Sequence, residues 1–494
     1  MKRVAQGFII TDHWGVGLLR SGWALALAGG LGACAHNSID AGDIEAAPSV
    51  PAEYSIPAPP LSTDVAQYWL MLDDPLLSEF VGQAIAQNLE IEQAAARLAQ
   101  ARASLRGARA GYLPSVSGNA GLARDIGDLA QDDFNLSLGA DVNWQVDLFG
   151  RISNDVAASR AELFASGYSL ADVQRLIVGT VAQSVIQARS SAVQLVIARD
   201  TLVNQDENLQ IALWRRQAGL VSSLDVEQAR VQRAQTAASI PALESDLAAT
   251  ANAISTLIGE EPGRARAALQ QAAIIPRPPA SVGLGAPAEL LRRRPDIRSA
   301  EARLIADSAR IEIARAQLLP LLRITGNIGT GATSFGSLFD LVTGNLFAGI
   351  SQLIFDGGRT RSQIGIAEAA ARGSLAGWRL SVLRALEEVE TAAIDLGASR
   401  ERVVLLTTAR EAAENAAILA RSQYQAGLID FQTLLSAENQ LLSARNSLAV
   451  SEAARAGSFV RLTQALGGGW VVSRTEILID PPEIIPTSDE SDGQ

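Results

Sequence analysis

The side chains that most often carry out catalysis are confined to one end of this chain. Both histidines, the single lysine and the single cysteine lie within the first 36 of its 494 residues, as His13, His36, Lys2 and Cys34. Beyond residue 36 the sequence therefore offers no Ser-His-Asp triad, no Ser-Lys pair, no cysteine nucleophile and no histidine-containing metal cluster.

Carboxylates remain as candidates for acid–base chemistry. Asp73 and Asp74 stand before a helical pattern, which favours a helix start, and Glu387, Glu388 and Glu390 fit a solvated helix face. No glycine-rich segment has the spacing of a phosphate-binding loop. The sequence predicts that the chain is not an enzyme and holds no cofactor or metal.

Cys34 is instead a candidate for lipidation. Basic residues and a short apolar stretch, Gly22 to Gly32, precede it, so residues 1–33 are predicted to be a signal peptide. The segment Leu31-Gly32-Ala33-Cys34 resembles the lipobox of bacterial lipoproteins, whose cysteine carries N-palmitoyl and S-diacylglycerol groups. An incidental cysteine behind an ordinary signal peptide is the alternative. Ala35, in place of Asp, suggests outer-membrane sorting by the same resemblance, and residues 34–66 are predicted to form a lipidated N-terminal tether.

The composition favours packed helices and argues against nucleic acid. The net charge is −12, which provides no broad basic surface, and only 5% of the residues are aromatic. Alanine recurs throughout, and small residues let helices approach closely. We expect no nucleic-acid partner.

The chain contains the same pattern twice. Arg151 to Gly259 aligns with Arg359 to Gly467 at an offset of 208 residues, and upstream the match continues at an offset of 206. We expect one repeat over 67–262 and a second over 263–468, followed by an acidic tail over 469–494. A repeat of this length indicates a duplicated architecture with internal pseudo-symmetry.

Each repeat is predicted to begin with helix and strand. Residues 75–110 read as one helical run, followed by a β-hairpin at about 113–149; the second hairpin is expected at about 321–356, with strands 324–331 and 346–355. Residues 134–148 alternate apolar and uncharged-polar or acidic side chains. Such a strand fits half of a soluble sandwich or a membrane barrel strand.

Long helical hairpins are predicted after the strands. Leucines and other apolar residues recur at heptad spacing from Arg151 and again from Arg359, without a break until Gly219 and Gly427. Helices over 76–110 and 224–258, placed end to end, would match one long helix in length. The run Arg292-Arg293-Arg294-Pro295 is interpreted as a helix start rather than a phosphate site.

Four strands with an apolar face cannot close a barrel, because two edges would stay unpaired in lipid. Oligomers are therefore required if the strands cross a membrane. The chain resembles the TolC-like outer-membrane factors, especially the lipidated NodT/OprM-type branch. The motifs that carry this resemblance are Tyr68-Trp69, Asp74-Pro75-Leu76, Gly111-Tyr112-Leu113-Pro114-Ser115, Trp144 to Arg151, Arg293-Arg294-Pro295-Asp296-Ile297, and Gln352 to Arg359.

The resemblance implies a mostly α fold with a membrane β-barrel portion. A homotrimer would form a 12-strand β-barrel continued by a 12-helix α-barrel, as a passive exit duct of a tripartite, RND-type efflux system in the outer membrane. A periplasmic adaptor (membrane fusion) protein, acting with an inner-membrane pump, would dock at Gly219, Leu220, Gly427 and Leu428. An elongated periplasmic scaffold lipoprotein without a pore is the alternative.

The resemblance also suggests a pore constriction at Asp430, Thr433 and Ser436. Relatives often carry aspartates where this chain has Thr433 and Ser436, so the acidic ring is absent from those two positions. Asp430, Asp225 and Glu438 lie nearby in the sequence as alternative sources of charge.

The lipid anchor is tested by Cys34→Ser. We expect this change to remove the label from mature protein isolated from cells fed an alkyne-tagged fatty acid, because no other cysteine is present to accept a lipid. Persistent labelling would mean that the anchor lies elsewhere.

Overall fold

A computed structural model describes residues 51, 53–55, 65–124, 126, 134–270, 273–280 and 282–470. The chain divides into two units, Met1–Ser49 and Val50–Gln494, and every described residue belongs to the second. The predicted signal peptide and Cys34 lie outside the described residues, as do most of the tether and of the tail.

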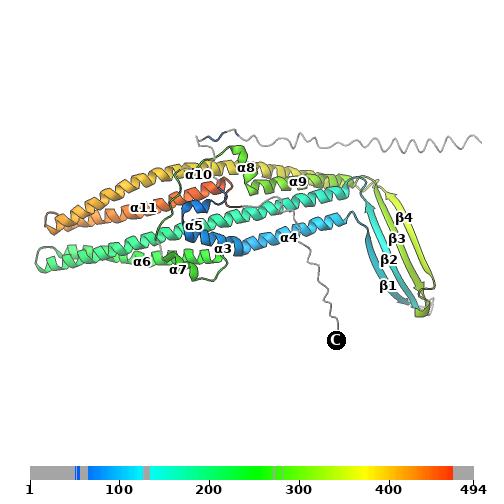
Figure 1. Ribbon diagram of the computed structural model, residues 1–494, viewed down its shortest axis with the longest axis horizontal. Helices are drawn as coiled ribbons and strands as arrows, with labels where there is room; N and C mark the ends of the chain where they lie inside the picture. The colour runs from blue at the N-terminus through cyan, green and yellow to red at the C-terminus, as the bar shows by residue number, and fades with distance from the viewer. Residues whose placement is uncertain are drawn as a thin grey trace, which may run out of the picture. The chain divides into compact units, whose positions relative to one another are not determined.

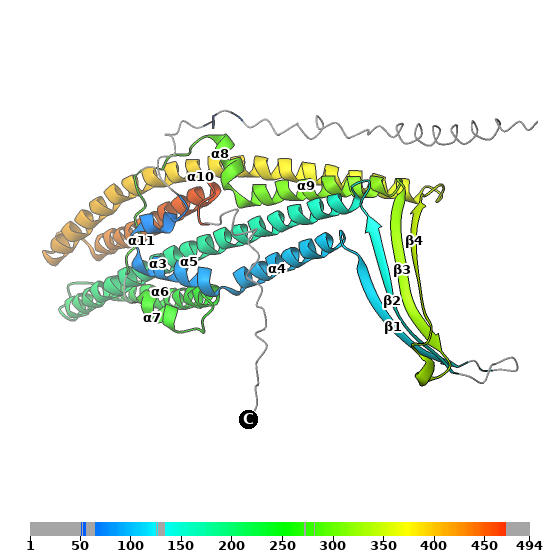
Figure 2. The ribbon, with the colours of Figure 1, turned by 45° about the vertical axis from the view of Figure 1, so that its right-hand side comes forward.

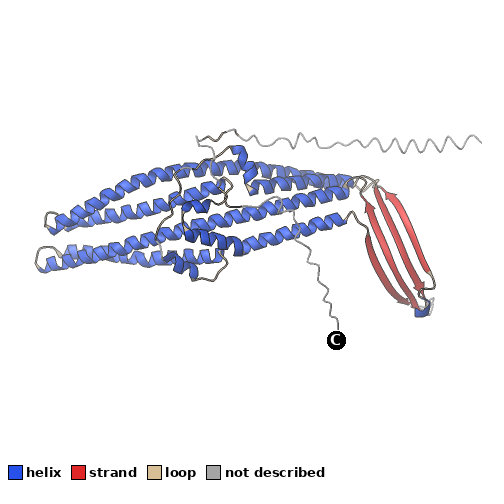
Figure 3. Ribbon diagram, viewed as in Figure 1, coloured by secondary structure: helices blue, strands red, loops and turns tan. Residues whose placement is uncertain are grey.

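Two long helical hairpins dominate the described unit (Figures 1 and 3). Helix α5 (Arg151–Gln217) and helix α10 (Arg359–Gln425) each have 67 residues, or roughly 100 Å at 1.5 Å per residue. Their partners, α6 (Ser223–Leu257) and α11 (Phe431–Ala465), each have 35 residues. The predicted duplicated αα-hairpins are confirmed, with identical lengths in the two copies.

An aspartate just before each long helix supplies the hydrogen bonds that its N-terminus requires. The N-cap residues, Gly150 and Gly358, have no side chain to do so. Asp147 accepts from the backbone N–H of Ile152 (3.0 Å) and of Ser153 (2.8 Å). Asp356 accepts from the backbone N–H of Gly358 and of Thr360 and from the Thr360 hydroxyl. These hydrogen bonds hold the pKa of Asp356 below its usual value.

Shorter helices precede the strands in both copies. In the first copy these are the 3₁₀ turn η1 (Tyr68–Leu72), α3 (Pro75–Gln87) and α4 (Leu89–Ala110); α7 (Arg264–Gln270), α8 (Pro287–Arg293) and α9 (Pro295–Ala316) follow in the connection and second copy. The prediction of one helical run over 75–110 is wrong, because Asn88 interrupts it. The Asn88 side chain accepts from the backbone N–H of Glu90 and Ile91 and caps a new helix.

That interruption lets α6 and α4 meet end to end beside α5, as the helix lengths predicted. The Asn88 amide donates to the Leu257 carbonyl oxygen, at the C-terminal end of α6, at 2.8 Å. In the second copy Arg294, just before α9, donates to the Ala465 carbonyl oxygen, at the end of α11, at 3.2 Å. The two junctions occupy equivalent places in the repeat, so one side chain at each closes a helix end.

Arg294 is almost wholly buried, with 2% of its surface exposed. Its guanidinium forms ion pairs with Asp296 at 2.7 Å and with Glu388 at 2.6 Å. The interpretation of Arg292 to Pro295 as a helix start is confirmed, since Pro295 is the first residue of α9. Glu388 was predicted to lie on a solvated helix face; its carboxylate also neutralises the charge of the buried Arg294 guanidinium.

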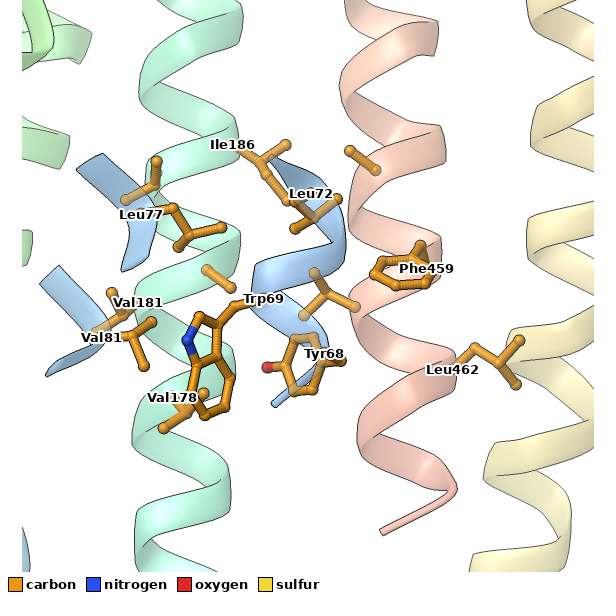
Figure 4. Packing of buried hydrophobic residues seen from close by; sticks show 14 of the residues in the cluster. Tyr68, Trp69, Leu72, Leu77, Val81, Val178, Val181, Ile186, Phe459 and Leu462 are labelled. Carbon is orange, nitrogen blue, oxygen red and sulfur yellow. The ribbon is translucent and has the colours of Figure 1, made fainter. Parts of the chain in front are cut away.

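The largest core cluster lies where α5 passes α3, η1 and α11 (Figure 4). The Tyr68 ring packs edge-on to Trp69 and to Phe459, with centroids 5.7 and 6.4 Å apart. The backbone N–H of Gly469 donates to the Ala66 carbonyl oxygen at 3.0 Å, so the start and end of the described helical region meet. In the described part of the chain, no helix is both long and apolar enough to cross a membrane.

The strands form one antiparallel sheet in the order β1-β2-β3-β4 (Figures 1 and 2). They span Ser115–Arg124, Phe134–Val146, Leu321–Ala332 and Val342–Ser351. The ladder between β2 and β3 joins the two repeats. The predicted strand over 346–355 is misplaced, because β4 begins at Val342 and its ladder ends at Ser351, opposite Leu321. Pro320 precedes Leu321 and has no N–H to extend that ladder.

The register shows which side chains share a face. Leu138 of β2 lies opposite Ala120 of β1 and Thr330 of β3, and Val142 lies opposite Val116 and Gly326. One face therefore carries mostly apolar or small side chains across four strands, with Arg124 at the end of β1 as its one charged member. Its residues are, by strand, Val116, Gly118, Ala120, Leu122 and Arg124; Phe134, Leu136, Leu138, Ala140, Val142, Trp144 and Val146; Leu322, Ile324, Gly326, Ile328, Thr330 and Ala332; and Val342, Gly344, Leu346, Ala348 and Ile350. The opposite face is polar or small, with Leu321 and Phe347 among its exceptions.

The junction of α6 with α3 is tested by Gly259→Ala. Gly259 has φ +73°, and a Cβ there would lie 2.5 Å from the Gln87 carbonyl oxygen. An L-residue in that conformation costs about 1–2 kcal/mol before the clash is counted. We expect a lower midpoint of guanidinium unfolding, followed by circular dichroism at 222 nm.

Gly82→Ala is the matched control. Gly82 lies inside α3, and a Cβ there meets no heavy atom within 4 Å. Alanine should stabilise this helix by about 0.5–1 kcal/mol. Equal midpoints for Gly259→Ala and the unchanged protein would contradict the close approach of the two helices.

Candidate functional site

The first helical hairpin turns at Gln217 to Ser222, here called the first tip. Gly219 has φ +73°, and the Leu220 N–H donates to the Arg215 carbonyl oxygen at 2.8 Å, which closes the end of α5. The Ser222 hydroxyl and the Asp225 carboxylate form a capping box at the start of α6. Leu220 is left with 73% of its surface exposed.

The second tip, Gln425 to Asp430, repeats this geometry. Gly427 has φ +75°, and the Leu428 N–H donates to the Gln423 carbonyl oxygen at 2.9 Å. Leu428 is 75% exposed. The structure thus puts all four predicted tip residues on exposed turns, and both glycines also end their helices, as the sequence suggested.

The predicted constriction residues follow the second tip at a spacing of three. The Asp430 carboxylate accepts from the Thr433 N–H at 2.8 Å and caps α11. This interaction with Thr433 lowers the pKa of Asp430 from its usual value. Asp430, Thr433 and Ser436 are all exposed, and residues three apart lie on one side of a helix.

A contact between the last turns of α5 and α10, next to the two tips, was not predicted. The Arg215 guanidinium of α5 lies 4.4 Å from the centroid of the Tyr424 ring of α10 and donates to the Gln425 carbonyl oxygen at 3.0 Å. Tyr424 also packs on Phe431, with ring centroids 5.4 Å apart. In the repeat, Arg215 and Tyr424 align with Gln423 and Arg216, so their divergence is the one signal that could have identified the contact.

Glu438 forms a second link between the hairpins. Its carboxylate accepts from the Asn208 amide of α5 at 2.6 Å and from Arg421 of α10 at 3.1 Å. Its side chain is only 9% exposed. Glu438, an alternative source of charge near the predicted constriction, is therefore buried and paired between the helices. Asp225, another such source, forms the capping box with Ser222.

The carboxylates considered for acid–base chemistry have structural partners. Asp74 caps α3 and pairs with Arg189 at 3.2 Å, which confirms the predicted helix start. Glu390 accepts from the Ser55 N–H at 2.9 Å, so part of the predicted tether contacts α10. Among the described residues, no group of His, Cys, Asp or Glu side chains could hold a metal ion.

Known proteins resemble this chain over most of its length. The family model described as outer membrane efflux protein matches residues 80–260 and 286–468. Nodulation protein T of Rhizobium leguminosarum bv. trifolii is 30% identical over 82% of this chain and 88% of its own. The pyoverdine export outer membrane protein OpmQ of Pseudomonas aeruginosa is 30% identical over 84% of this chain and 89% of its own.

The fold has a solved counterpart as well. The outer-membrane channel OprN superposes with a TM-score of 0.78 at 32% identity, covering 85% of this chain and 97% of that one. The two segments that match the family model fall within the two repeats found in the sequence.

The contact next to the tips is tested by Arg215→Gln. The change removes a charge-assisted hydrogen bond and a cation–π contact, together about 1.4 kcal/mol. Amide hydrogen exchange of peptides covering 423–430, followed by mass spectrometry, should accelerate about tenfold, since 1.4 kcal/mol corresponds to that factor.

Arg216→Gln is its control, because Arg216 is exposed and its side chain forms no hydrogen bond or ion pair with any described residue. It removes the same charge one residue away and should leave exchange unchanged. Equal acceleration by both variants would assign the effect to lost charge and not to the contact.

Proposed function

Because the chain belongs to the outer membrane efflux protein family, we propose that it is the exit duct of a tripartite, RND-type export system. It is an efflux channel of the outer membrane, and this family consists of channels rather than enzymes. In the proposed system the duct is passive, and an inner-membrane pump supplies the energy. Small molecules pass from the periplasmic pump complex to the exterior.

The single observation that carries this proposal is the sheet. It has one largely apolar face and one largely polar face, and its outer strands, β1 and β4, each have one edge that no described strand pairs. In lipid each orphaned backbone group costs several kcal/mol. Further copies of the same sheet would pair these edges and turn the apolar face toward lipid.

Three copies suit a duct better than two. Two sheets would give eight strands, and the interior of an eight-stranded barrel is just wide enough for its own side chains. Three sheets would give twelve strands and leave an aqueous lumen. We therefore propose a homotrimer with a 12-strand β-barrel.

The helices support the same arrangement. Helix α5 packs against α4 and α6 on one side and against α9 and α11 on the other. Helix α10 packs against α9 and α11 in turn. Since α4 with α6, and α9 with α11, are each stacked end to end, each chain supplies four helical columns. The free side of α10 exposes large apolar residues along its length, among them Ile366, Leu383, Ile394, Leu405 and Leu419. Burial of this stripe against the next chain would build a 12-helix α-barrel below the strands.

The tips are proposed to receive the adaptor protein. Leu220 and Leu428 are equivalent in the two copies and similarly exposed, so a trimer would present six similar contact points. Gly219 and Gly427 hold the turns that expose them. The pore would narrow at Asp430, Thr433 and Ser436, where Asp430 is the one charged member.

Anchoring is proposed through a covalent lipid on Cys34, with N-palmitoyl and S-diacylglycerol groups. The support is the lipobox-like segment before it and its position as the single cysteine. Two lipid signals on one residue provide the buried CH₂ groups that stable membrane attachment requires.

The proposal is tested by Leu138→Arg. Leu138 lies on the apolar face near the middle of β2, where an arginine in contact with lipid costs about 2–4 kcal/mol. We expect loss of the trimer from the outer-membrane fraction, measured by fractionation and native electrophoresis.

Ser137→Arg is the matched control, one residue away on the polar face. It should insert and assemble, because its side chain would meet water in the lumen. Normal insertion of Leu138→Arg would instead favour a periplasmic scaffold lipoprotein without a pore.

A further inference from the structure

A cavity of about 440 Å³ lies where the polar face of the sheet meets the start of α5. Two arginines line it, Arg151 from the first turn of α5 and Arg323 from β3. Asn143 and Gln145 of β2 also line it, and Asp155 is the one carboxylate among its lining residues. Nothing in the proposed function uses this group of side chains.

Gln145 brings the two arginines together. Arg151 Nη2 donates to Gln145 Oε1 at 2.7 Å. Gln145 and Arg323 are direct partners in the β2–β3 register, so their side chains leave the sheet on the same face, with Cβ atoms about 5 Å apart. Arg151 is therefore hydrogen-bonded to a side chain that is the direct neighbour of Arg323 on the polar side of the sheet.

None of the nearby acids, including Asp155 in the cavity lining, lies within ion-pair distance of either arginine. Neither Arg151 nor Arg323 forms an ion pair with any residue that the structure describes. The Asp147 carboxylate is occupied by the backbone N–H groups of Ile152 and Ser153. Asp141 lies four residues before Gln145 on β2, about 13 Å along the strand, and accepts from the Asn119 amide.

The neighbouring strand adds no charge at this level. Gly349 of β4 is the register partner of Arg323 and has no side chain. The Phe347 ring occupies the space over Gly349, since a Cβ there would lie 2.5 Å from Phe347 Cε1. The Arg323 guanidinium is thus left exposed beside an uncharged surface.

We propose that Arg151 and Arg323, here called the junction arginines, form an anion-binding site that favours passage of anionic solutes through the duct. The inference rests on the proposed function, which turns the polar face toward the lumen. Three chains carry six of these guanidinium groups at one depth of the pore. Rings of arginine select anions in pores, because they raise the local concentration of the opposite charge.

The test is the ion selectivity of purified full-length protein in planar lipid bilayers under a KCl gradient. The double variant Arg151→Gln/Arg323→Gln should lower the chloride-to-potassium permeability ratio, obtained from the reversal potential, about threefold or more. Arg323→Gln alone should lower it part of the way. Because the Arg323 side chain forms no hydrogen bond or ion pair with the described residues, this single change breaks no such contact.

Two control variants distinguish the effect of charge at the junction arginines from the effect of charge elsewhere on the protein. Arg323→Lys keeps the charge and should keep the ratio. Arg277→Gln removes one charge from an exposed position between α7 and α8 and should also leave the ratio unchanged.

An unchanged ratio in Arg323→Gln and in the double variant, at normal conductance, would overturn the anion site alone. Absence of any conductance in the unchanged protein would instead overturn the proposed duct, and the anion site with it.

Discussion

Backbone N–H and C=O groups that lose water must find another hydrogen-bond partner, and this requirement shapes both the helical region and the sheet. Helix ends that meet inside the packing are closed by single side chains, Asn88 on the Leu257 carbonyl and Arg294 on the Ala465 carbonyl. The sheet satisfies its two inner strands and leaves β1 and β4 with open edges. No strand among the described residues pairs those edges, and they are the strongest physical reason for proposing a closed oligomer.

Duplication and divergence serve different parts of the molecule. The helical hairpins have the same lengths in both copies, and the junctions between stacked helices occupy equivalent positions. The repeat therefore preserves the helix lengths and the side chains that close the helix ends. The copies differ where side chains meet the proposed lumen or the other hairpin. Arg215 and Tyr424 form a contact that their repeat partners cannot, and Arg323 aligns with Ser117. The repeat therefore maintains the framework, and departures from it mark the candidate functional positions.

Local patterns predicted the long elements well. The heptad stripes after Arg151 and Arg359 identified both 67-residue helices, because a helix of that length repeats its signal many times. Gly219 and Gly427 located both tips, since each supplies the positive φ that ends a helix. Short or irregular elements were predicted less well. Asn88 resembled an ordinary helix residue, and its role depends on the carbonyl of Leu257, which is 169 residues away.

The sequence by itself determined the two repeats, their long helices, their tips, and the clear alternation of apolar and polar residues along β2. Each of these signals is local and periodic. Only the tertiary structure decided the register of β3 and β4, the burial of Arg294 and Glu438, the contact of Arg215 with Tyr424, and the approach of Arg151 to Arg323 through Gln145. These features join residues that lie far apart in the chain, and the partner that satisfies a charge or a backbone group is set by packing and not by sequence spacing.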